Sequence, residues 1–149
     1  EGRLLKVGRD FDGNVAIIKL FPGLNAPVLS AIVDIPELKG IVLETYGSGN
    51  APSAVWFINI LQKGIARGLH FVNVTQCWGG RVNMGQYETS TKLKEIGVLS
   101  GADITTEAAV TKMMYFLRFQ QHSRRQSMHR RISPTLVVES TVLIQEIKI

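Results

Sequence analysis

Three short apolar runs recur along the chain and set its framework. They are Asn14 to Leu20, Ile41 to Thr45 and His70 to Thr75, and each is rich in β-branched or aromatic residues without strict polar alternation. This pattern is typical of strands that are covered on both faces. Because helical spacing separates the runs, the sequence predicts βαβ units with a parallel sheet.

Helix signals fill the gaps between these runs. Asn25 is a good N-cap for a helix over residues 26–35, which Pro36 ends. A second helix is expected from Ser53 to Gly68, and residues 54–61 are apolar nearly all round, which predicts burial on all sides. The pattern continues with a helix over 86–96, a short fourth strand at 98–99 and a final helix capped by Thr105. The final helix carries a stripe that we expect to lie on the sheet: Ala109, Val110, Met113, Met114 and Leu117.

Composition fits one ordinary globular domain. The chain has 149 residues, a net charge of +5 and one cysteine, Cys77. It contains no apolar run of about 18 residues that could cross a bilayer. A single cysteine excludes an internal disulfide framework and suits a reducing compartment. The first nine residues are polar and basic, so we expect no signal peptide, and a start at Glu1 suggests a fragment or a trimmed chain.

The character of the chain changes near residue 118. Residues 118–131 hold five arginines without apolar periodicity, and residues 134–149 return to β-branched residues. We therefore expect a lead-in over residues 1–13, an α/β domain over 14–117 and an atypical basic tail over 118–149. The tail is interpreted as a basic interaction arm, a solvated terminus with an added strand, or an unnatural ending.

The loop after the second strand is the main candidate site. Gly47-Ser48-Gly49-Asn50 lies where a strand gives way to a helix, at the carboxyl edge of a parallel sheet, where ligands bind. It is neither a Walker loop nor a full dinucleotide fingerprint, and Ser48 lacks the flanking glycines of a nucleophile elbow. A tight turn that lets the helix pack closely on the strand is the simplest interpretation.

Other reactive residues carry weaker signals. Cys77 is expected to be a buried small hydrophobe at a strand end, and the three histidines show no zinc-ligand spacing, so no metal or cofactor is expected. Thr89-Ser90-Thr91-Lys92 places hydroxyls beside an amine, but a solvated helix face explains it better. Spacing alone therefore supports an α/β domain whose candidate ligand site is a loop at the edge of the sheet, and it defines no reaction.

Three segments resemble a known enzyme family. They are Gly40 to Pro52, Gly80 to Tyr87 and Gly97 to Lys112, and Asn14 to Gly23 fits the same pattern. Their order and spacing are similar to the C-terminal domain of type I, cytoplasmic-type bacterial L-asparaginases. The resemblance implies a three-layer, flavodoxin-like domain with a small parallel sheet of about four strands, in a cytoplasmic enzyme that converts L-asparagine to L-aspartate and ammonia.

The same resemblance implies that the residues that carry out the chemical step lie in another domain. In that family the nucleophilic threonine lies in an amino-terminal domain, within Thr-Gly-Gly-Thr and Gly-Thr-Asp-Thr motifs that are absent here. Without a nucleophile the covalent step cannot proceed. We therefore expect no catalytic residue in this chain, no activity from it alone, and an N-terminal asparaginase domain as its partner.

The family pattern also implies roles for individual positions. The substrate-proximal loop corresponds to Tyr46, Gly47, Ser48, Gly49 and Asn50, and cross-subunit support to Gln86, Tyr87, Glu88, Thr89 and Ser90. A possible effector region corresponds to Glu44, Thr45 and Cys77. Glu44 stands where some regulated members carry arginine, which disfavours capture of an effector carboxylate because two anions would meet.

The family comparison further suggests an assembly. Type I enzymes usually continue with a closing helix, and nothing from Arg118 onward resembles it. The exposed apolar surface must then be covered by another chain or by pairing of residues 136–147, so we expect a homodimer or a larger oligomer. Two alternatives stay open: a small-molecule-binding flavodoxin-like module, and a nucleic-acid binder that uses Arg118 to Arg131.

Overall fold

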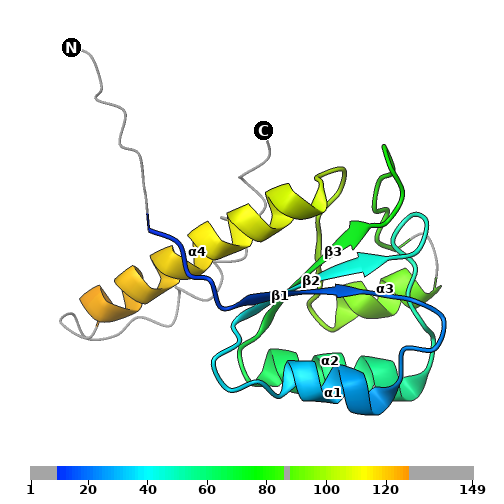
Figure 1. The fold of residues 1–149 in the computed structure, drawn as a ribbon, viewed down its shortest axis with the longest axis horizontal. Helices are drawn as coiled ribbons and strands as arrows, with labels where there is room; N and C mark the ends of the chain where they lie inside the picture. Colours follow the sequence, from blue (N-terminus) through cyan, green and yellow to red (C-terminus); the bar gives the residue numbers. More distant parts are fainter. Residues whose placement is uncertain (1–9, 86–87, 128–149) are drawn as a thin grey trace.

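The computed structural model describes residues 10–85 and 88–127. Within these residues four parallel strands form one sheet, connected by helices (Figure 1). The strands are β1 (Val15–Lys19), β2 (Gly40–Thr45), β3 (His70–Thr75) and β4 (Leu99–Ser100), and the helices are α1 (Ala26–Val33), α2 (Val55–Ala66), α3 (Glu88–Glu95) and α4 (Thr106–Ser127). The predicted α/β class with about four parallel strands is confirmed.

The strands lie in chain order, β1-β2-β3-β4. Val15 pairs with Gly40 and Gly40 with His70, so the first three strands start level and their carboxyl ends share one edge. Flavodoxin itself has the order 2-1-3-4-5. Here the order never reverses, and the loop after β2 is the feature that places candidate residues at the centre of the carboxyl edge.

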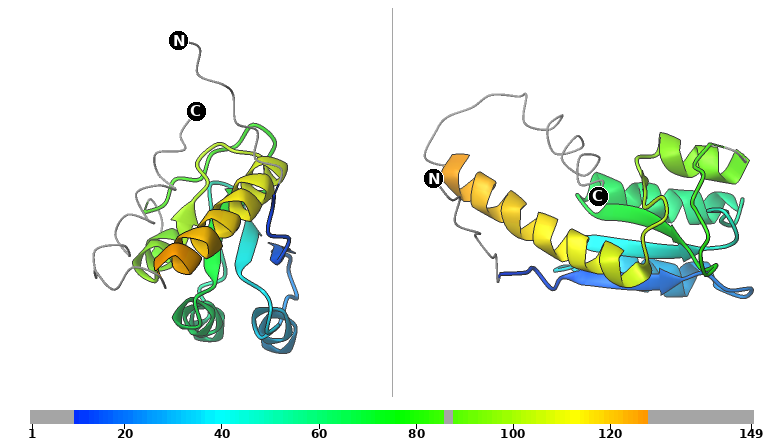
Figure 2. Two further views of the ribbon diagram at one scale, coloured as in Figure 1. Left: turned by 90° about the vertical axis from the view of Figure 1, so that its left-hand side faces the viewer. Right: turned by 90° about the horizontal axis from the view of Figure 1, so that it is seen from above.

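Helices cover both faces of the sheet, which gives the three expected layers (Figures 1 and 2). Helices α1, α2 and α3 bury side chains against one face, and α4 crosses the other. The core on the first face includes Leu29, Ile41, Phe57, Phe71 and Leu93, and the core under α4 consists of Val42, Val72, Val74, Ala109, Met113, Phe116 and Leu117.

Three expected helix ends are confirmed by their hydrogen bonds or backbone. Asn25 Oδ1 accepts from the N–H of Val28 at 3.1 Å, which caps α1. Thr105 Oγ1 accepts from the N–H of Ala108 at 3.3 Å at the start of α4. After α2, Gly68 has a φ of +94°, the left-handed conformation that ends many helices.

Two expectations about helix faces are wrong. Helix α2 buries only a stripe of Phe57, Leu61 and Gly64, and Val55 is 74% exposed, because the sheet covers one side of the helix. In α4, Phe116 rather than Met114 completes the buried stripe. A run of apolar residues shows that a helix is hydrophobic but not which of its sides meets the sheet.

Helix α4 continues unbroken beyond residue 117 to Ser127, and its last turns extend past the strands (Figure 1). The change of composition near residue 118 is therefore not a helix end. The division into 14–117 and 118–149 stays a prediction. Residues 1–9 and 128–149, including the 136–147 segment, lie outside the described residues.

Candidate functional site

The loop at residues 46–50 is a closed turn at the carboxyl edge of the sheet. Tyr46 and Asn50 form an isolated antiparallel bridge, with N···O distances of 2.9 Å and 2.8 Å between their backbones. The N–H of Gly49 also donates to the carbonyl of Tyr46 at 3.0 Å. These three bonds close the turn through its own backbone.

A fully buried asparagine from β3 holds this loop in place. Asn73 Nδ2 donates to the carbonyl of Gly49 at 3.1 Å, and Asn73 Oδ1 accepts from Thr45 Oγ1 at 2.5 Å. Thr75, at the end of the same strand, donates through its hydroxyl to the carbonyl of Gly47. Asn73 was not predicted to be a site residue, although an amide among the apolar residues of a buried strand is a signal that marks it.

The glycine at position 49 is required by space as well as by conformation. Its φ is +105°, and a Cβ there would come within 2.8 Å of Val82 Cγ1. The loop is also bonded to the segment before α3, because the N–H of Asn83 donates to the carbonyl of Ser48 at 3.0 Å. The predicted tight turn is therefore fixed between the ends of β2 and β3 and the segment that leads to α3.

Among the described residues, the first turn of α3 contacts the loop through the side chains of Thr89 and Asn50. Thr89 Oγ1 donates to Asn50 Oδ1 at 3.4 Å, which joins the two segments expected to act together. Ser90 is fully buried and accepts from the N–H of Gly85 at 3.2 Å, so the interpretation of residues 89–92 as a solvated face is wrong for Ser90. Residues 86 and 87 lie outside the described residues.

Glu88 points to solvent and is paired along its own helix. Lys92 Nζ lies 2.7 Å from Glu88 Oε1, and this hydrogen bond lowers the pKa of the Glu88 carboxyl. A carboxylate that stays ionised and paired with its own helix is a poor proton acceptor. No described contact joins Glu88 to the loop.

The three residues of the expected effector region do not share one set of contacts. The carboxylate of Glu44 accepts from Thr106 Oγ1 at 2.5 Å and lies 3.4 Å from Lys19 Nζ, on the α4 side of the sheet. Thr45 contacts Asn73 beneath the loop on the other side. Cys77 is exposed after β3, so the expectation that it is buried is wrong.

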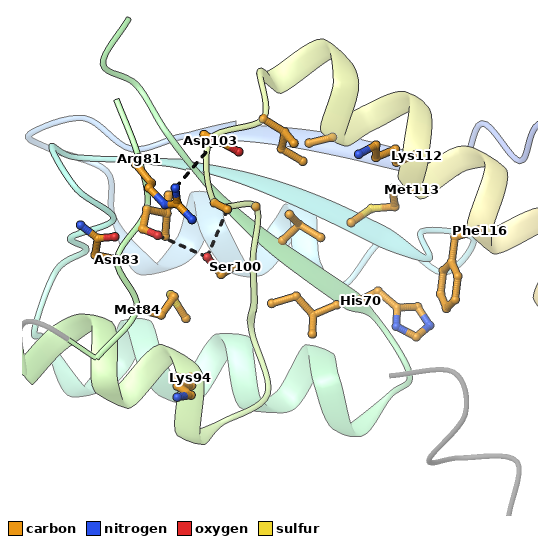
Figure 3. A pocket seen from close by; sticks show the side chains of 17 residues that line it. His70, Arg81, Asn83, Met84, Lys94, Ser100, Asp103, Lys112, Met113 and Phe116 are labelled. Atoms are coloured by element: carbon orange, nitrogen blue, oxygen red, sulfur yellow. Dashed lines mark hydrogen bonds and ion pairs between the residues drawn. The ribbon is translucent and has the colours of Figure 1, made fainter. Parts of the chain in front are cut away.

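A hollow of about 580 Å³ runs along the outer edge of β4, between α3 and α4 (Figure 3). Arg81, Asn83, Ser100 and Asp103 lie at one end of it and His70 and Phe116 at the other, with Leu99 and Met113 among the apolar lining. None of residues 46–50 lines this hollow. Val82 and Asn83 line the hollow and also lie against the loop, so the hollow is a neighbour of the candidate site and not the site itself.

The described residues contain no group of three or more histidine, cysteine, aspartate or glutamate side chains placed to hold a metal ion. No helix in the described part of the chain is long and apolar enough to cross a membrane.

Comparison with known proteins identifies the family. Residues 14–128 match the glutaminase/asparaginase C-terminal domain. The chain belongs to this family. It is similar to L-asparaginase 1 of Escherichia coli K12, at 42% identity over 103 residues that cover 69% of this chain and 30% of that protein. It is also similar to the human 60 kDa lysophospholipase, at 38% identity over 113 residues, 76% of this chain and 19% of that protein.

Solved structures of the asparaginase family agree with the fold. L-asparaginase I from Vibrio cholerae matches with a TM-score of 0.66 and 33% identity, over 80% of this chain and 36% of that one. The chain thus spans about a third or less of the length of these relatives. The resemblance to asparaginases seen in the sequence is confirmed at the level of this domain.

Proposed function

We propose that this chain serves as the C-terminal domain of a type I, cytoplasmic L-asparaginase, whose whole enzyme hydrolyses L-asparagine to L-aspartate and ammonia. The nucleophile comes from an N-terminal domain. The C-terminal domain described here contributes the carboxyl edge of its sheet to the active site of a neighbouring subunit. The observation that carries the proposal is the contact between Asn50 and Thr89, which joins the two segments that the family pattern assigns to the substrate.

The chemistry of the edge fits a supporting role. Asn50 offers an amide that both donates and accepts, on a loop that is closed by backbone bonds between Tyr46 and Asn50 and is bonded to Asn73. Such a group can bind the charged ends of an amino acid without moving a proton. Among the described residues, the side chain of Asn50 contacts the hydroxyl of Thr89, and no carboxylate or imidazole bonds to either group, so the proposed contribution of Asn50 is to position the substrate.

A chimera tests this role. Residues 14–128 replace the matching segment of E. coli L-asparaginase 1, and ammonia release from asparagine is measured for the chimera and for the isolated chain. We expect hydrolysis by the chimera and none by the chain alone, because the nucleophile belongs to the other domain. Hydrolysis by the purified chain would overturn the assigned division of roles.

A point substitution in the chimera tests the site itself. Asn50→Ala removes a hydrogen bond to a charged group, worth about 1.5 to 3 kcal/mol, so kcat/KM should fall about 10- to 100-fold. Asn59→Ala, on the exposed side of α2, is the matched control and should leave kcat/KM unchanged. Equal values for the two variants would show that the loop does not support the substrate.

A further inference from the structure

The hollow between α3 and α4 has no part in the proposed function. It is here named the β4 hollow, and its lining includes Leu99 and Ser100 of β4, Lys94 of α3 and Met113 of α4 (Figure 3). Its volume of about 580 Å³ is within the range of small-molecule sites. Among the described strands β4 ends the sheet and has two residues, so the sheet covers little of the space between the two helices.

Apolar side chains line one part of the β4 hollow. Val72, Met113 and Phe116 belong to the core under α4, and Leu99 packs against that core. The rings of His70 and Phe116 meet edge to face at the end of the hollow, with their centroids 5.4 Å apart. The apolar body of a ligand that lies here extends the core under α4 and leaves water.

The opposite end of the β4 hollow is polar. Arg81, Asn83, Ser100 and Asp103 gather there (Figure 3). The guanidinium of Arg81 and the amide of Asn83 are hydrogen-bond donors, which a negatively charged head group requires. A few polar groups beside an apolar lining are typical of sites that fix the orientation of a small ligand.

The lining also carries an excess of positive charge. Its cations are Arg81, Lys94 and Lys112, and Asp103 is the one carboxylate among the described lining residues. Asp103 Oδ2 lies 3.8 Å from Arg81 Nη1 with both side chains largely exposed, so this carboxylate offsets one cation at most. The remaining positive charge favours an anion over a neutral or cationic ligand.

We propose that the β4 hollow binds a small amphipathic anion. Its carboxylate or phosphate head lies at the end that holds Arg81, and its apolar body lies along Leu99 towards Phe116. An acidic peptide fits less well, because a peptide that adds a strand to a sheet needs a longer edge than the two residues of β4. None of residues 46–50 lines the hollow, so failure of this proposal leaves the role of Asn50 untouched.

Calorimetric titration of the full chain tests the chemistry of the ligand. Octanoate and octyl phosphate are the probes, and acetate and octanol are controls that each lack one half of the amphipathic anion. We expect saturable binding of one molecule of at least one probe, with acetate and octanol binding about tenfold or more weakly. The tighter probe identifies the head group. Binding of neither probe, equal binding of a control, or binding only of an acidic peptide of alternating glutamate and valine would overturn the proposal.

Two lysines on α3 locate the head group. Lys94 lines the hollow, whereas Lys92 pairs with Glu88 along the helix and does not line it. Lys94→Gln should raise the Kd of the tighter probe about three- to tenfold. Lys92→Gln removes the same charge from the same helix and should change that Kd by less than about twofold. Equal effects of the two variants would reduce the binding to general attraction by a basic protein and would contradict the proposal.

Methyl NMR of the wild-type chain locates the apolar body and requires no substitution. The methyl resonances of Leu99 and Met113 should shift as the probe is added, with the Kd that calorimetry gives. The methyl resonances of Leu29 and Leu61, in the core on the other face of the sheet, should stay in place. Shifts that spare Leu99 and Met113 would show that the probe binds elsewhere, and the β4 hollow would then not be its site.

Discussion

Gly47 and Gly49 stand two residues apart in the same loop and differ in what surrounds them. A Cβ at position 47 would meet nothing within 4 Å, whereas at position 49 it would meet Val82 at 2.8 Å and Asn73 at 3.3 Å. We therefore expect Gly47→Ala to lower the free energy of unfolding by about 1 to 2 kcal/mol through backbone strain alone. Gly49→Ala adds a steric clash to its strain and should cost about 2 to 4 kcal/mol.

Urea denaturation of the two glycine variants measures this difference. Both residues have positive φ, but +47° lies near the left-handed helical region and +105° lies outside it, so the excess cost at Gly49 combines greater backbone strain with the close contact with Asn73 and Val82. Equal costs at the two positions would show that the loop does not press on β3.

Asp12 links the lead-in to the start of β2 and should make stability depend on pH. Burial of its carboxyl raises the pKa, but the hydrogen bond from Lys39 Nζ at 2.6 Å and the bonds from Asn14 outweigh burial and lower it below the ordinary 3.8. A lowered pKa in the folded state stabilises the fold above the ordinary pKa, and this contribution is lost as the pH falls through the lowered value.

The Asp12→Asn variant should therefore be less stable than the wild-type chain by about 1 to 3 kcal/mol at pH 7, and the gap should narrow towards pH 3. Thermal denaturation at a series of pH values measures the gap. Asp103→Asn removes an exposed carboxylate 3.8 Å from Arg81 and should change stability by less than about 0.5 kcal/mol throughout. A gap for Asp12→Asn that stays constant with pH would contradict the assignment.

Among the elements, the first turn of α4 is stabilised by its cap. The Thr105 hydroxyl accepts from the N–H of Ala108. The pKa of the Glu107 carboxyl is lowered by a hydrogen bond from the backbone N–H of Glu107 itself and by a second one from the side chain of Thr105. Thr105→Ala should lower the free energy of unfolding by about 1 kcal/mol. Thr111→Ala, where the hydroxyl bonds only to the carbonyl of Glu107 one turn earlier, should cost less than half as much in the same urea titration.

The elements that sequence could predict are those whose local signals and tertiary contacts agree. Strands β2 and β3 were predictable because runs such as Ile41 to Leu43 are typical of a sheet buried on both faces. Strand β1 was predicted to be buried in the same way, but it lies at the edge of the sheet and leaves Ile17 52% exposed. The exposed side of α2 was not predictable from the sequence, because Val55 has the same apolar character as the residues that meet the sheet. Helix α4 continues to Ser127 through a polar stretch whose sequence lacks the apolar period that predicts a helix.

The candidate site divides in the same way. The turn at residues 46–50 was predictable because its glycines and asparagine favour a tight turn. The hydrogen bond that holds the turn was not predictable, because it joins Asn73 to Gly49, which are 24 residues apart and are brought together only by the fold. The exposure of Cys77 likewise depends on the direction in which the chain leaves β3.

At the scale of the whole molecule, the two-sided cover of the sheet should set the order in which it opens. Strand β2 pairs on both edges and is covered by α1 and α2 on one face and α4 on the other, so its amides should exchange with solvent only when the entire domain unfolds. Strand β4 has two residues and one described neighbour, and α3 buries only Ser90 and Leu93. Both should open locally.

Hydrogen exchange followed by mass spectrometry measures this order directly. Peptides from α3 and β4 should exchange at least tenfold faster than those from β2, while the bonded N–H groups of Tyr46, Gly49 and Asn50 stay protected because Asn73 ties the turn to β3. In Asn73→Ala the turn should lose protection and approach the rate of α3, whereas β2 keeps its rank. Loss of protection in β2 alongside the turn would show that the loop edge and the central sheet open as one unit, and that the site lacks the separate rigidity that a substrate-positioning edge requires.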